Sequence, residues 1–149
     1  MIDSDAITWA APDSDHPARR ASQRSAATVA KGVKEDWVAL FAEDGIVEDP
    51  VGPSMFDPDG KGHHGHDGIG GFWDKAIANV ARFHFTITDS FANGDTCANV
   101  GTITTLLEDG SQVRTEGVFV YRVDEQGLIK SMRAHWEFDR AMATLTRDS

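Results

Sequence analysis

The most unusual chemical feature of the sequence is an aspartate inside a short apolar run, GIVEDPVG (residues 45–52). Side chains alternate between the two faces of a strand, so Asp49 shares a face with Val47 and Val51, whereas Glu48 lies on the opposite face, toward solvent. A carboxylate on the core side loses hydration, which raises its pKa and makes it a better base. We therefore expect Asp49 either to be a base or ligand contact in a dry pocket, or to cap a helix or pair with an arginine.

A second group of polar side chains, in the Gly-rich loop that follows, has the residue types of a metal site. His63, His64 and His66 lie beside Asp57 and Asp59. The segment DPDGKG lacks an oxygen ligand at the fifth position of a calcium loop, and the histidines lack the helical HxxxH spacing of a zinc site. The spacing therefore favours a solvated loop at a pocket rim, with no metal. No phosphate-binding or nucleotide-binding motif is present either, so we expect no cofactor.

Composition excludes several other functions. The net charge of −10 argues against binding nucleic acid or an anionic membrane, and no apolar run approaches the ~20 residues that span a bilayer. The acidic N-terminus does not resemble a secretion signal, and the lone Cys97 cannot form an internal disulfide. These features predict a cytoplasmic protein.

The elements that must position Asp49 follow from hydrophobic periodicity. A chain of 149 residues that is 40% hydrophobic fits one domain, which we place at 18–149 after a flexible acidic tail over residues 1–17. Periodicity predicts helices over 18–31, 34–44 and 69–80, with Asp67 as the N-cap of the last. Alternating strands then follow one another to the end of the domain. Helices followed by meandering antiparallel strands predict an α+β fold.

Apolar stripes on these elements either form an ordinary core or line a cavity for a flat apolar ligand. The side chains that we expect to contact such a ligand come from the first strand, two of the helices and the last strands: Phe41, Val47, Phe72, Phe119, Met132 and Trp136. On the other face of the sheet, Val118, Val120 and Ile129 are also apolar, which predicts a homodimer through that face.

Three segments together resemble the ketosteroid isomerase branch of the NTF2-like (SnoaL-like) superfamily: WVALFAEDGIVEDPVG, GHDGIGGFWDKAI and GVFVYRVDEQGLIKSMRAHWEF. The resemblance covers about residues 18–138. It implies a cone, formed by a curved antiparallel sheet with helices on its concave face. It also implies a cofactor-free steroid Δ-isomerase that moves a proton from C4 to C6 of a 3-oxo-Δ5 steroid, with Asp49 as the base.

The same resemblance implies two oxyanion donors, and here the sequence departs from the family. Ser25 stands where the family has a tyrosine, Phe119 stands where it has a protonated aspartic acid, and a supporting tyrosine falls at Trp73. The oxyanion hole is therefore rebuilt or absent. The candidate replacement donors are Trp73, Tyr121 and Ser25, in that order.

Two other functions are compatible with these residues. One is a non-catalytic protein of this fold that binds a steroid or lipid, which the replaced oxyanion donors favour. The other is a SnoaL-like cyclase, or an epoxide hydrolase of this fold, although the Asp–Arg–Asp set of the hydrolases is not evident.

Overall fold

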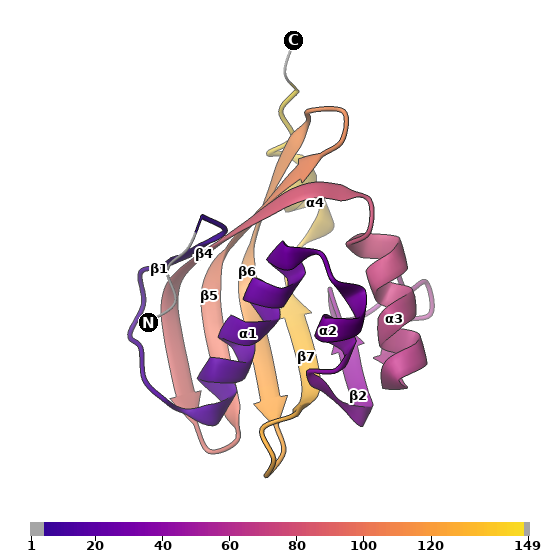
Figure 1. Cartoon of the computed structure of the whole chain (residues 1–149). Coiled ribbons are helices and arrows are strands. Elements are labelled where there is room, and N and C mark those ends of the chain that lie inside the picture. The colour runs from indigo at the N-terminus through magenta and orange to yellow at the C-terminus, as the bar shows by residue number, and fades with distance from the viewer. Residues whose placement is uncertain (1–4, 148–149) are drawn as a thin grey trace.

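A curved seven-stranded sheet forms one layer of the structure, a computed structural model that describes residues 5–147. The strand order is β1-β4-β5-β6-β7-β2-β3, and neighbours are antiparallel except for β1 with β4 and β2 with β7. The helices α1, α2 and α3 lie across one face of the sheet (Figure 1). The strands are β1 (Ile7–Trp9), β2 (Phe41–Glu48), β3 (His63–His64), β4 (Val80–Asn93), β5 (Thr96–Leu107), β6 (Gln112–Val123) and β7 (Ile129–His135).

The expected α+β cone is confirmed, and the first predicted helix corresponds to α1 (Pro17–Lys31). Proline suits the first turn of a helix because its missing N–H would have no partner there. The backbone N–H of Ala18 donates to Nδ1 of His16, and the helix ends at Gly32, whose φ of 77° is left-handed. The remaining helices are α2 (Lys34–Val38), α3 (Gly65–Ala76) and α4 (Phe138–Met142).

The predicted helix over 34–44 is wrong beyond Val38. The chain leaves the helix there and enters β2 at Phe41, which pairs with Ile129 of β7. Phe41 is 1% exposed, and its ring packs edge-on against Trp37 with centroids 5.0 Å apart. Because strand pairing and burial of Phe41 outweigh the local helical pattern, the helix is short.

Helix α3 begins and ends four residues before the predicted helix 69–80. His64 is its N-cap, in place of Asp67, and makes no side-chain capping hydrogen bond. The strand β3 directly before it pairs with β2, so sheet pairing determines where the helix starts.

Part of the segment expected to be a flexible tail is ordered. Strand β1 pairs in parallel with β4, with Ile7 opposite Phe85 and Trp9 opposite Ile87. Ile7 is 2% exposed, so this added strand contributes to the core. Residues 1–4 of the tail and residues 148–149 of the predicted domain lie outside the described residues.

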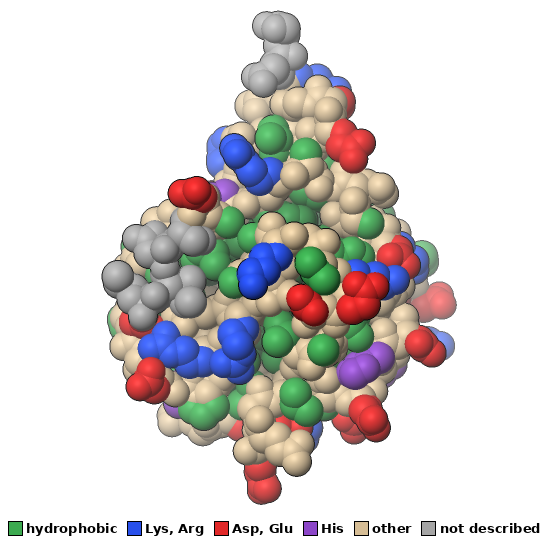
Figure 2. All heavy atoms as spheres, viewed as in Figure 1, with side chains coloured by type: hydrophobic (Ala, Val, Ile, Leu, Met, Phe, Trp, Pro, Cys, Tyr) green, Lys and Arg blue, Asp and Glu red, His purple; other side chains and the backbone are tan. Residues whose placement is uncertain are grey.

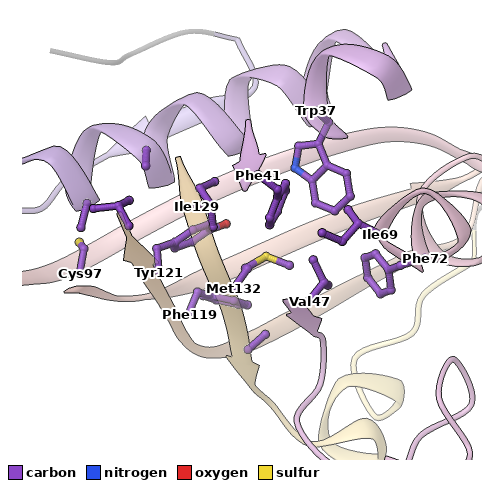
Figure 3. Packing of buried hydrophobic residues seen from close by; sticks show 14 of the residues in the cluster. Trp37, Phe41, Val47, Ile69, Phe72, Cys97, Phe119, Tyr121, Ile129 and Met132 are labelled. Atoms are coloured by element: carbon purple, nitrogen blue, oxygen red, sulfur yellow. The ribbon is translucent and has the colours of Figure 1, made fainter. Parts of the chain in front are cut away.

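The core lies between the helices and the sheet (Figure 3). Within it, Trp37 is 1% exposed and contacts Phe41, Phe72 and Trp73 with ring centroids 5.0, 6.2 and 5.6 Å apart. On the surface, acidic and basic side chains are interspersed, and hydrophobic side chains are visible between α1 and the upper part of the sheet (Figure 2). None of the helices in residues 5–147 is long and apolar enough to cross a membrane.

Candidate active site

A cavity of about 460 Å³ lies between the helices and the concave face of the sheet. This volume is within the range of small-molecule sites. The residues that line the cavity are mostly apolar. The register of β5 and β6 shows which polar side chains lie near the hairpin that joins these strands and which lie further from it. Near the β5–β6 hairpin, Thr105 pairs with Val113, whereas several residues further along the same strands Asn99 pairs with Phe119 and Tyr121 pairs with Cys97. Lys75 and Asn79 line the cavity at the end of α3, and the other polar lining residues away from the hairpin are Ser22, Gln23, Ser25, Asp49, Asn99 and Tyr121.

Asp49 lies directly after β2 and lines this cavity. Val47 is 0% exposed on the same face of the strand, whereas Glu48 on the other face meets Arg133 at 3.4 Å. The Trp136 indole Nε1 donates a 2.6 Å hydrogen bond to Oδ1 of Asp49. Loss of hydration in the apolar cavity raises the pKa of Asp49 to about 6, and the Trp136 hydrogen bond opposes this rise. The carboxylate can therefore accept and release a proton near neutral pH.

Two hydroxyl groups, Ser25 of α1 and Tyr121 of β6, lie together in the cavity wall; we call them the hydroxyl pair. The Tyr121 hydroxyl donates to Ser25 Oγ at 3.3 Å, and Trp37 Nε1 donates to the same Oγ at 3.0 Å. Burial raises the pKa of Tyr121 to about 12, and the negative charge of Asp49 also raises it, so the phenol remains a proton donor. The hydroxyl hydrogen of Ser25 has no acceptor among residues 5–147 and is available to a ligand oxygen.

The other residues predicted for the site separate into two groups. Phe72, Phe119, Met132 and Trp136 line the cavity. The remaining three, Phe41, Val47 and Trp73, are buried in the core and lie outside the cavity lining. Trp73 packs against Trp37 with ring centroids 5.6 Å apart and is not among the residues that line the cavity, so the structure gives it no access to a ligand there.

The histidines expected in a solvated loop lie beside the cavity, but that expectation is wrong for them: His63 and His64 form β3, His66 is in α3, and His63 is buried. His63 packs against the ring of Phe72 at 5.0 Å, and burial lowers its pKa. His66 Nε2 donates to the Phe41 carbonyl at 2.9 Å. Residues 5–147 contain no group of three or more His, Cys, Asp or Glu side chains that could hold a metal. Met55 and Phe56, in the loop between β2 and β3, line the cavity, so this loop forms part of the cavity wall.

Sequence reasoning missed Asn99, a buried cavity residue at 3% exposure. The available signal was its position in the run TCANVG of β5, where alternation places it on the same face as buried Cys97 and Gly101. Asparagine is disfavoured in strand interiors, so an inward-facing one indicates a polar role.

The fold and this cavity define an NTF2-like cone with an acidic residue in its pocket. The sequence profile of the SnoaL-like domain matches residues 22–132, and the chain belongs to that family.

Solved structures support the same assignment. RV0760c from Mycobacterium tuberculosis is 35% identical with a TM-score of 0.80, over 91% of this chain and 98% of that one. Its complex with estradiol-17beta-hemisuccinate matches at 36% identity and a TM-score of 0.78, over 89% and 99% of the two chains. The Δ5-3-ketosteroid isomerase from Mycobacterium sp. is 34% identical with a TM-score of 0.78, over 88% and 98%. No curated protein matches the sequence.

Proposed function

We propose that this protein is a cofactor-free isomerase that shifts a C=C bond of a 3-oxo-Δ5 steroid or a similar enolisable polycyclic ketone. The observation that carries the proposal is Asp49: a carboxylate in an apolar cavity, with its pKa raised to about 6 by lost hydration and its orientation fixed by Trp136. The likeness to a ketosteroid isomerase and to a protein that holds an estradiol derivative supports a steroid-like ligand.

The reaction needs only one proton acceptor that works in both directions. Ionised Asp49 removes a proton from C4 of the bound ketone, and the electron pair of that C–H bond moves toward the 3-oxygen to give a dienolate. Protonated Asp49 then returns the same proton to C6, which leaves the double bond conjugated with the carbonyl. Because Asp49 regains its charge, no cofactor is consumed.

Negative charge on the 3-oxygen requires a hydrogen-bond donor. We assign this role to the hydroxyl pair, Ser25 and Tyr121, in preference to Trp73, which lies outside the cavity lining. The hydroxyl hydrogen of Ser25 is free for a ligand, and its oxygen already accepts from Trp37 and Tyr121. A hydroxyl that accepts two hydrogen bonds is a stronger donor in turn.

The second candidate function is steroid binding without turnover. It is favoured by Phe119, an apolar side chain in the cavity wall at the position where the family resemblance places an acidic donor. Under this alternative, Asp49 and the hydroxyl pair contact polar groups of the ligand but transfer no proton.

Incubation with 5-androstene-3,17-dione separates the two functions, because the conjugated product absorbs ultraviolet light that the substrate does not. An isomerase converts an excess of the steroid at a rate proportional to enzyme concentration. A saturable binding curve with all steroid recovered unchanged would overturn the proposal in favour of the binding protein.

A further inference from the structure

The amide of Asn99 is part of a buried hydrogen-bond network behind the cavity wall. Its Nδ2 donates to Ser22 Oγ at 2.9 Å. Its Oδ1 accepts from Ser90 Oγ at 2.7 Å and from Cys97 Sγ at 3.2 Å. Ser22, Ser90 and Asn99 are all at most 4% exposed, so water does not replace these partners.

Arg19 binds both ends of this network, and its carbonyl fixes the orientation of the Asn99 amide. Arg19 Nε can only donate, and it donates to Ser90 Oγ at 3.0 Å, while the Ser90 hydroxyl donates to Asn99 Oδ1. At the other end the Arg19 carbonyl can only accept, and it accepts from Ser22 Oγ at 2.7 Å. Ser22 Oγ must therefore accept from the amide nitrogen of Asn99, which settles the orientation of the amide.

With this orientation, one hydrogen of Asn99 Nδ2 binds Ser22 and the other has no acceptor among residues 5–147. Asn99 lines the cavity, so this second N–H is available to a ligand. A buried amide N–H without a partner costs free energy, and a ligand oxygen would recover that cost.

The guanidinium of Arg19 strengthens this donor. Arg19 is 6% exposed, and its guanidinium donates to neutral oxygens, those of Ser14 and Ser90. Within residues 5–147 no carboxylate lies at ion-pair distance from it. A buried cation that donates through Ser90 to the amide oxygen polarises the amide and makes its N–H a better donor to negative charge.

Asn99 and the hydroxyl pair lie next to each other in the cavity wall. Ser22 and Ser25 are three residues apart on the cavity face of α1, which makes them neighbours on the helix surface. Asn99 binds the first serine and Tyr121 binds the second, and the two strand residues are diagonal neighbours on β5 and β6.

We propose that Asn99 is a ligand-binding residue that donates its free amide N–H to a negatively charged oxygen of the ligand, beside the hydroxyl pair, and that Arg19 is a positioning residue that orients and polarises this amide through Ser90. The inference rests on the proposed function for the kind of ligand. It gives Asn99 the anion-stabilising role that the family resemblance places at position 119, which the apolar side chain of Phe119 cannot perform.

The test measures ligand ionisation and needs no turnover. Estradiol carries a phenol whose ionised form absorbs ultraviolet light differently, and its 3-deoxy analogue lacks that oxygen. Binding of both is measured in an Asp49→Asn background, so that the base does not titrate. In that background, Asn99→Leu keeps the size of the side chain and removes the hydrogen-bond donor. Thr105→Val is the matched control, because it removes a polar group from the cavity wall near the hairpin.

We expect Asn99→Leu to weaken binding of ionised estradiol by about tenfold or more, the effect of one hydrogen bond to a charged group, and to lower the ionised fraction at saturation. Affinity for the 3-deoxy analogue should stay within about threefold, and Thr105→Val should change neither. Ser90→Ala, which interrupts the connection to Arg19, should lower the ionised fraction in the same direction while Asn99 remains.

Equal losses for estradiol and its 3-deoxy analogue would overturn the proposal, because they indicate a structural role for Asn99. So would an unchanged ionised fraction in both Asn99→Leu and Ser90→Ala. If Asn99→Leu lacks a thermal unfolding transition, Ser90→Ala decides by the same readout. Because ionisation of a bound phenol does not depend on proton transfer by Asp49, the result stands whether or not the wild-type protein isomerises a steroid.

Discussion

The indole nitrogen of Trp136 donates a 2.6 Å hydrogen bond to Oδ1 of Asp49, which precedes it by 87 residues. Burial raises the pKa of this carboxyl to about 6, and the hydrogen bond works against that rise because it stabilises the ionised form. Trp136 therefore does two things for the proposed base. It holds the carboxylate toward the cavity, and it limits how far the pKa rises.

We expect Trp136→Phe to move the acidic limb of the isomerase pH–rate profile to higher pH. In the wild type, activity should rise with pH as Asp49 ionises around its pKa of about 6. Removing the donor destabilises the carboxylate, so the pKa of Asp49 rises and a higher pH is needed for the same ionised fraction. The profile of kcat/KM against pH measures this, and a limb that stays in place or moves to lower pH would contradict it.

We expect Asp49→Asn to stabilise the protein at pH 8. The folded-state pKa is raised from 3.8 to about 6, so the stability contribution of Asp49 is fully present below pH 3.8 and is lost as pH rises through 6. Asparagine avoids burying a charge, so the free energy of unfolding should rise by about 3 kcal/mol at most for a pKa shift of this size. Denaturant unfolding at pH 8 and pH 4 measures the gain, which should shrink toward pH 4. A variant that is less stable than wild type at pH 8 would contradict the burial of Asp49.

We expect Ser25→Ala to cost more stability than Tyr121→Phe. The first change leaves the buried donors of Trp37 and Tyr121 without their shared acceptor, and each such group costs about 1–3 kcal/mol. The second leaves Ser25 still bound to Trp37. Denaturant midpoints compare the two variants, and equal stabilities would show that the Ser25 hydroxyl is not the common acceptor.

A homodimer through the outer face of the sheet remains a prediction, with a corrected set of residues. Ile129 is 1% exposed and belongs to the core, because the register of β7 shifts beside it. Val100 and Val118 pair across β5 and β6 and are each 37% exposed, and Phe91 on the same face is 64% exposed. A cluster of exposed apolar side chains of this kind indicates an interface between protein chains.

Sedimentation velocity at micromolar concentration measures the association. We expect Val118→Asp to give monomers from a dimeric wild type, because the buried charge would lack a partner. Val33→Asp makes the same change at a residue that is 39% exposed elsewhere on the molecule, and it should leave the dimer intact. A monomeric wild-type protein would refute the prediction.

Local sequence patterns predicted α1, α3, the main strands and the inward position of Asp49, but not β1, β3 or α4, because alternation and helical periodicity depend only on neighbours in the chain. They did not predict the structure of segments in which contacts with distant parts of the chain outweigh the local pattern. Phe41 leaves the helical pattern to pair with Ile129, and Ile7 pairs with Phe85 in a segment that composition alone assigns to a tail.

In the candidate site, too, local patterns predicted some features and long-range contacts determined the others. The inward position of Asp49 follows from its own strand, but its partner Trp136 comes from the other end of the domain. Trp73 has a helical spacing suited to the core, and only the packed structure distinguishes core from cavity wall. The partners of Asn99 come from α1 and β4 as well as its own strand, so no local pattern indicates them.

The most direct test of the central claim is the isomerisation rate of 5-androstene-3,17-dione by wild type, Asp49→Asn and Glu48→Gln. The two variants remove adjacent carboxylates, one in the cavity and one paired with Arg133 on the opposite face. We expect Asp49→Asn to lose roughly a hundredfold or more in turnover with little change in steroid affinity, and Glu48→Gln to stay close to wild type. Full turnover in Asp49→Asn would contradict the assignment of Asp49 as the base.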